Sequence, residues 1–145
     1  MGASVGPYWP GMEEELTEEQ LESCPGIGSK AWGDWIPDRE YEPHTLEAIR
    51  KLNADAVRAF TTDGVKDEDV EWVTPQELRE AAQKLGEAIK ADLPETEIIL
   101  ESYKRASKWV YSAKEDFLRD LEDIEAITHW AEEMGAAKMT LEVNW

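Results

Sequence analysis

Aromatic and acidic side chains alternate within residues 24–44, a segment that is also rich in glycine and proline. Six of them are candidate contact residues: Trp32, Asp34, Trp35, Asp38, Tyr41 and His44. Aromatic rings beside carboxylates can bind a cation or stack against a sugar ring, and an imidazole can move a proton near neutral pH. The competing interpretation is that the tryptophans cover the core beneath a long loop. The sequence leaves both interpretations open.

The GIGSK run at residues 26–30 has some of the residues of a phosphate-binding loop. That loop requires Gly-x-x-x-x-Gly-Lys followed by Ser or Thr, between a buried strand and a helix. Here the spacing differs, and a short acidic helix is expected before the run instead of a strand. Acidic surroundings also repel an anion. We therefore do not expect phosphate to bind at this run.

The two histidines give little support to a metal site. His129 is four residues from both Glu125 and Glu133, so the three side chains share one face of a helix. A di-metal helical bundle needs Glu-x-x-His on two helices, together with further carboxylates, and the sequence lacks that pattern. The Glu125–His129–Glu133 face also points away from the apolar stripe of its own helix. We expect it to be solvated.

Nucleophilic catalysis has no signature in this chain. The Gly-x-Ser-x-Gly pattern of a nucleophile elbow is missing. Cys24, the single cysteine, precedes Pro25 with no base beside it, which favours a buried or incidental thiol. We predict no catalytic residue, no metal and no cofactor, and we lean toward a protein that is not an enzyme.

Cysteine content and hydropathy bear on where the protein works. One cysteine cannot form an intramolecular disulfide. The chain does not start with a basic region followed by an apolar run, and no segment is apolar for long enough to span a bilayer. We expect a cytoplasmic protein with no membrane partner.

Negative charge dominates the composition. The net charge is −18 at pH 7, which disfavours nucleic acid and anionic membranes as partners and favours a basic protein. The charge is unevenly distributed. Three acidic blocks, residues 1–44 at −8, 61–80 at −5 and 115–145 at −7, are separated by two blocks that are each at +1. If these blocks meet in space, their fields add to one docking surface; otherwise they are three solvated faces.

Apolar periodicity and capping residues predict four main helices after one short helix. The short helix follows a capping box at residues 17–20, where Thr and Gln satisfy free backbone amides. Thr74-Pro75 is another strong helix start, Ser112 with Glu115 is a third, and Gly135 suits a left-handed helix end. The four predicted helices cover residues 43–61, 75–93, 95–111 and 112–134.

Alternating apolar residues predict a strand over residues 137–145, with Leu141 and Val143 on its buried face. A lone strand leaves its backbone unsatisfied, and the candidate partners are residues 69–73 and the N-terminal arm near Val5. The expected fold is α+β and predominantly α-helical, with this strand in a small sheet. We expect one domain over residues 1–145, an extended arm at 1–12 and a long loop at 24–44.

Three functional hypotheses follow from these features. The first is a non-enzymatic acidic interaction protein, of the inhibitor, immunity or regulatory type, that docks a basic protein through clustered carboxylates and aromatic anchors. The second is a small enzyme or small-molecule binder with a pocket under the 24–44 loop. The third is an accessory subunit that oligomerises through a strand edge or a helical face. Across these hypotheses, we expect the chain to be a monomer or a small homo-oligomer.

Overall fold

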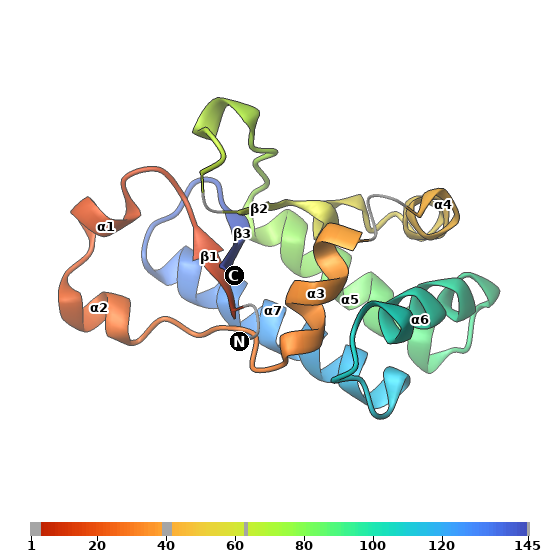
Figure 1. Cartoon of the computed structure of the whole chain (residues 1–145). Coiled ribbons are helices and arrows are strands. Elements are labelled where there is room, and N and C mark those ends of the chain that lie inside the picture. Colours follow the sequence, from red (N-terminus) through yellow and green to blue (C-terminus); the bar gives the residue numbers. More distant parts are fainter. Residues whose placement is uncertain (1–3, 39–41, 63, 145) are drawn as a thin grey trace.

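A computed structural model describes residues 4–38, 42–62 and 64–144, and Figure 1 shows the arrangement. Over these residues, seven α-helices and a three-stranded sheet confirm the predicted α+β, predominantly helical class. The elements, with η for 3₁₀ helices, are β1 (Ser4–Tyr8), α1 (Met12–Glu15), α2 (Glu18–Glu22), α3 (Lys30–Asp38), α4 (Pro43–Lys51), η2 (Asp55–Arg58), β2 (Phe60–Thr62), η3 (Asp67–Asp69), α5 (Pro75–Lys90), α6 (Pro94–Ala106), α7 (Ala113–Glu133) and β3 (Thr140–Asn144).

The sheet joins segments from the start, middle and end of the chain, in the order β1-β3-β2. β1 pairs antiparallel with β3, with Val5 opposite Val143. An isolated bridge links Val73 to Met139 just before β3. Both predicted partners of the C-terminal strand are therefore confirmed, and the expected buried face is also observed, because Leu141 and Val143 are fully buried.

The helix predicted over residues 43–61 ends ten residues early. α4 stops at Lys51, and Asn53 then takes a left-handed conformation with φ of 56°, which asparagine tolerates better than most residues. The chain continues through η2 into β2, which pairs parallel with β3. The prediction was wrong here because apolar residues in η2, such as the buried Val57, prolong a helix-like spacing.

Residues 24–44, expected to form a long loop, instead contain the nine-residue helix α3. The Ser29 hydroxyl accepts a hydrogen bond from the amide of Ala31 at 3.0 Å and so caps the helix start. Gly33 and Pro37 make the segment look unlike a helix, since each lowers helix propensity. Burial of the aromatic face of α3 outweighs that cost.

Local signals placed the other helix starts with mixed success. The capping box at Thr17 and the Thr74 cap, whose hydroxyl accepts from the Glu77 amide at 3.0 Å, are both present. Ser112 makes no side-chain cap. Asp116 replaces it, because its Oδ2 accepts the amides of Tyr111 and Ser112 at 3.0 and 3.2 Å.

Aromatic rings fill the core where α3, α6 and α7 meet. Trp35, Tyr103 and Phe117 contact one another edge to face, with centroids 5.0–5.9 Å apart. Trp32 packs against Trp35 and Phe117 at 5.0 and 5.4 Å. In Figure 1, α3 lies between the sheet, α1 and α2 on its left and α4 and α6 on its right.

Candidate functional site

The two tryptophans of the 24–44 segment belong to the core. Trp32 and Trp35 are both fully buried, and the Trp35 indole donates to the Ser102 hydroxyl at 3.0 Å. Of the two interpretations that the sequence left open, the structure therefore shows the inward orientation for both rings. In this conformation neither ring has surface to offer a partner.

The remaining candidates of that segment are dispersed. Asp34 accepts a hydrogen bond from the Ser107 hydroxyl at 2.8 Å and so anchors the connection between α6 and α7. Asp38 and His44 are exposed at the end of α3 and the start of α4. Tyr41 lies outside the described residues. Among the described candidates, the two tryptophans are buried, and a contact role for the others stays a prediction.

The GIGSK run leads into the helix α3, where the sequence predicted a loop. However, the backbone amide of Gly28 in this run is already hydrogen-bonded. The Gly28 amide donates to Asp123 Oδ2 on α7 at 3.0 Å. A carboxylate of the chain itself therefore takes a donor that a phosphate loop would offer, and the expectation of no phosphate binding gains a structural reason.

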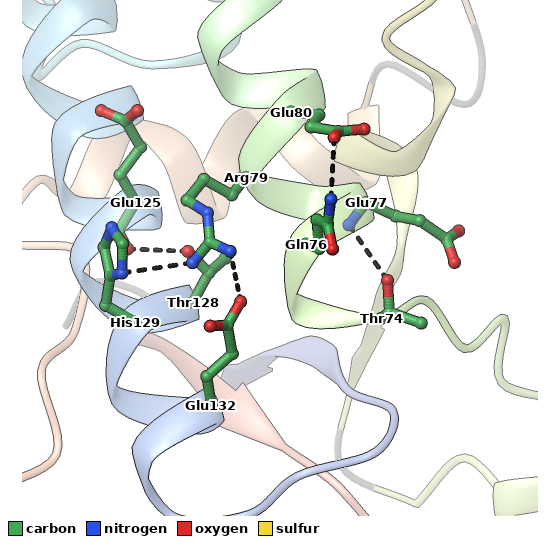
Figure 2. A network of polar contacts seen from close by, with 9 residues as sticks. All are labelled: Thr74, Gln76, Glu77, Arg79, Glu80, Glu125, Thr128, His129 and Glu132. Carbon is green, nitrogen blue, oxygen red and sulfur yellow. Dashed lines mark hydrogen bonds and ion pairs between the residues drawn. The ribbon is translucent and has the colours of Figure 1, made fainter.

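Arg79 of α5 reaches between two residues of α7, as Figure 2 shows. Its guanidinium lies 3.2 Å from His129 Nδ1 and forms an ion pair with Glu132. Arginine can only donate, so His129 Nδ1 accepts. His129 thus helps to join the two helices and is not a partner of Glu125 and Glu133 in a metal site. Across the described part of the chain, no group of three or more His, Cys, Asp and Glu residues is placed to hold a metal ion.

A different set of residues forms the best candidate site, which we call the acidic face: Tyr8, Glu14, Asp67, Trp72 and Glu142. The Tyr8 hydroxyl donates to Asp67 Oδ1 at 2.9 Å, across 59 positions of sequence. The rings of Tyr8 and Trp72 are tilted, with centroids 5.9 Å apart. The Trp72 indole donates to the Asp67 carbonyl at 3.3 Å, so the two rings and the η3 loop hold one another in place.

Carboxylates from all three acidic blocks act on Tyr8. Its hydrogen bond to Asp67 raises the pKa of the Tyr8 hydroxyl, and burial and the negative charges of Asp67, Glu142 and Glu14 raise that pKa further. Glu14 belongs to the first block, Asp67 to the second and Glu142 to the third. One carboxylate of each block is therefore close enough to Tyr8 for its charge to act on the hydroxyl. Figure 1 shows the elements that carry these residues: α1, β1, β3 and the segment between β2 and α5.

The face already accommodates a cation. Lys138 places its ammonium 5.0 Å from the centroid of the Trp72 ring, within the range of a cation–π contact. Glu14 and Asp67 are exposed, while Tyr8, Trp72 and Glu142 are partly buried. The ion pairs at Glu42, Glu47, Asp92, Asp116 and Glu132 lie outside this face.

Asp120 carries a carboxyl group that is buried in the core beside Tyr103. It is fully buried on α7 and accepts a hydrogen bond from the Tyr103 hydroxyl at 2.5 Å. Its other oxygen has no hydrogen-bond partner among the described residues. Burial raises the pKa of Asp120 to about 7, against the Tyr103 hydrogen bond, and the charges of Asp123 and Asp116 add to the rise. The Asp120 carboxyl therefore gains and loses its proton near neutral pH.

Cys24 offers no reactive thiol. Burial raises the pKa of its thiol to about 11, and the Sγ atom is 3.3 Å from the Pro25 carbonyl oxygen. The thiolate, which is the nucleophilic form, is scarce at pH 7. This agrees with the incidental thiol expected from the sequence.

Sequence reasoning missed the acidic face because its members are far apart in the chain. Tyr8 and Trp72 were assigned to an extended arm and an uncertain strand, and neither was a candidate contact residue. One signal was available: the two strand partners predicted for residues 137–145 were the segments that carry these two rings. Joining both partners to one strand would have brought the rings together.

Within the part of the chain that the structure describes, every helix is too short or too polar to cross a membrane. Comparisons with protein-family models, with curated proteins and with solved structures find no match for this chain.

Proposed function

We propose that this protein is a non-enzymatic interaction protein, of the inhibitor, immunity or regulatory type, that docks a basic protein partner through the acidic face. One observation carries the proposal: Asp67 is hydrogen-bonded to Tyr8, whose ring contacts Trp72, and the charges of Glu142 and Glu14 from the other two acidic blocks reach the Tyr8 hydroxyl. Clustered carboxylates alone would give attraction without a fixed geometry. The ring pair adds a site at which a partner's side chain can be held.

Binding would proceed in two physical stages. The net charge of −18 attracts a basic partner at long range and raises the association rate. At contact, a lysine or arginine of the partner replaces Lys138 over Trp72, with Asp67 beside it. Rings held by neighbouring hydrogen bonds lose little entropy on binding, which is typical of residues that carry most of an interface's energy.

The setting that we propose follows from composition. The partner is a basic protein, with neither nucleic acid nor a membrane as target, since both repel an acidic surface. The protein acts in the cytoplasm, as a monomer or a small homo-oligomer, and uses no cofactor.

Two matched triple variants test the proposal. The first, Glu14→Gln with Asp67→Asn and Glu142→Gln, removes the three carboxylates of the acidic face. The control removes three from α6: Glu95→Gln, Glu97→Gln and Glu101→Gln. Both change the net charge by the same amount, so long-range attraction falls equally. Each is titrated by calorimetry with a lysine- and arginine-rich peptide at low and high salt.

We expect the variant of the acidic face to lose at least tenfold in peptide affinity, while the α6 control loses about threefold or less. High salt should weaken the wild-type complex strongly, because surface charges are screened. Equal losses in the two variants would show that only net charge matters, and the assignment of a specific face would then fail.

A further inference from the structure

We propose that the connection between α6 and α7, residues 107–112, forms a second binding site, for a small molecule that carries a flat ring and one negative charge. The site is separate from the acidic face and does not depend on the function proposed for it. Gly28, Ser29 and Lys30 of the 24–44 segment line it, but none of the six contact candidates of that segment does.

The connection is held rigidly at both ends. The Ser107 hydroxyl donates to Asp34 at 2.8 Å and accepts the Trp109 amide at 3.1 Å. At the other end, Asp116 Oδ2 accepts the amides of Tyr111 and Ser112. Asp34 of α3 thus fixes the Ser107 side chain, while Ser107 and Asp116 of α7 satisfy backbone amides that water would otherwise solvate. The connection is preorganised, which lowers the entropy cost of binding.

Its two aromatic rings nevertheless face solvent. Trp109 is 41% exposed and Tyr111 is 84% exposed. Large rings at the surface are unfavourable unless something covers them, and neighbouring exposed rings mark interaction sites. The sequence predicted a helix over residues 95–111, which includes Trp109. That helix ends at Ala106, which frees the ring.

A cavity of about 280 Å³ opens beside these rings. Its lining includes Lys30, Trp109, Tyr111, Asp116 and Arg119. The Lys30 ammonium is 4.8 Å from the Trp109 centroid. Arg119 is 3.6 Å from Asp116, whose other oxygen holds the two amides of the connection. The cavity therefore offers ring surface, two cationic groups and one carboxylate, Asp116, whose oxygens are already engaged by Arg119 and by the two amides.

Size and charge identify the occupant. The cavity suits a ligand of about one ring rather than a macromolecular segment. A polyanion such as nucleic acid would meet the repulsion of a protein at −18, whereas a single negative charge meets far less. At short range, Lys30 and Arg119 attract that charge, and Trp109 and Tyr111 stack against the ring.

Three probes separate these contributions. Benzoate has the ring and the charge, benzamide has the ring alone and acetate has the charge alone. Each is titrated into isotopically labelled protein, and the indole N–H signal of Trp109, assigned from Trp109→Phe, is followed by NMR. We expect saturable shifts with benzoate, and at least tenfold weaker binding of benzamide and acetate.

Variants show which residues are responsible for benzoate binding. Trp109→Ala should weaken benzoate binding at least tenfold, and Lys30→Gln with Arg119→Gln should reduce the preference for benzoate over benzamide to about twofold. Lys104→Gln, which removes an exposed lysine of α6 outside the cavity, should change neither. The proposal is overturned if benzoate gives no saturable shift up to about 20 mM, if it shifts signals away from the cavity, or if Lys104→Gln has the effect of the double variant. Melting curves confirm that each variant is folded.

Discussion

Trp72 and Trp109 both reach the surface, and each has a lysine ammonium about 5 Å from its ring, Lys138 and Lys30 respectively. Their surroundings are opposite in charge. Trp72 lies among the carboxylates of the acidic face, whereas Trp109 lies beside a cavity lined by Lys30 and Arg119. In our two proposals, the same combination of ring and cation serves two kinds of site. The charge around a ring, rather than the ring itself, decides whether its partner is basic or acidic.

The two regions also differ in how they are positioned. The acidic face is assembled by strand pairing, because β3 brings β1 and the segment around Val73 to its neighbourhood. The 107–112 connection is held by side-chain oxygens of Asp34, Ser107 and Asp116. The first site depends on strand pairing, and the second depends on a few side-chain hydrogen bonds.

The largest expected effect distinguishes surface tryptophans from core tryptophans. Trp35→Ala removes a fully buried ring that contacts Tyr103 and Phe117, and should lower the free energy of unfolding by about 4 kcal/mol. Trp109→Ala should lower it by about 1 kcal/mol, since much of that ring is already in water. Urea unfolding of both variants measures the difference. Similar losses would mean that Trp109 is a core residue.

A pH effect of nearly the same size on the free energy of unfolding is expected from Asp120. The pKa of Asp120 is raised to about 7 in the folded protein, so the folded state binds a proton that the unfolded state has released above pH 4. The contribution of Asp120 to the free energy of unfolding should therefore be largest below pH 4. It should fall by up to about 1.4 kcal/mol per pH unit as the pH rises to 7. Asp120→Asn should remove that slope.

The control for Asp120 is Asp69→Asn, which neutralises an exposed carboxylate of η3. Its unfolding free energy, measured between pH 4 and 8, should retain the wild-type slope. If Asp120→Asn also retains the slope, Asp120 is ionised in the folded protein and the account of its burial is wrong.

Measuring both ligands on a variant of each surface tryptophan tests the comparison directly. Trp72→Ala should weaken binding of the lysine- and arginine-rich peptide about tenfold, or about 1.4 kcal/mol, without changing benzoate binding. Trp109→Ala should do the reverse. Calorimetry with both ligands on both variants gives the four values. If either variant weakens both ligands, the two sites are coupled or the fold is perturbed.

The smallest expected effect comes from the lysine that already occupies Trp72. Lys138→Met removes the internal competitor for the ring and should raise the affinity for the peptide about threefold. Lys104→Met on α6 makes the same change in net charge and should raise it less. Equal gains in the two variants would assign the whole effect to net charge.

The sequence predicted elements whose signals are local. The capping box at Thr17, the Thr74 cap and the alternation of Leu141 and Val143 all depend on neighbouring residues, and all three are present. The early ends of α4 and α6 were missed, because the left-handed Asn53 and the extended Ser107 are set by packing beyond the helix. α3 was missed because burial of its aromatic face overrides Gly33 and Pro37.

The candidate site residues were chosen from composition, which does not show where side chains point. Aromatic and acidic residues crowded into residues 24–44 indicated a contact surface, but Trp32 and Trp35 point into the core. Residues that do gather at the surface, such as Tyr8 and Asp67, are 59 positions apart. Composition showed that an acidic surface was present, and only the tertiary contacts show where carboxylates meet rings.

The most direct test of the central claim is an NMR titration of the labelled protein with the lysine- and arginine-rich peptide. We expect the largest shifts at Tyr8, Glu14, Asp67, Trp72 and Glu142, with little change at Trp109 and Tyr111. These shifts should saturate at one peptide per chain and weaken as salt is raised. Shifts distributed over all exposed carboxylates, or centred on α4 and α6, would contradict the existence of a specific acidic face.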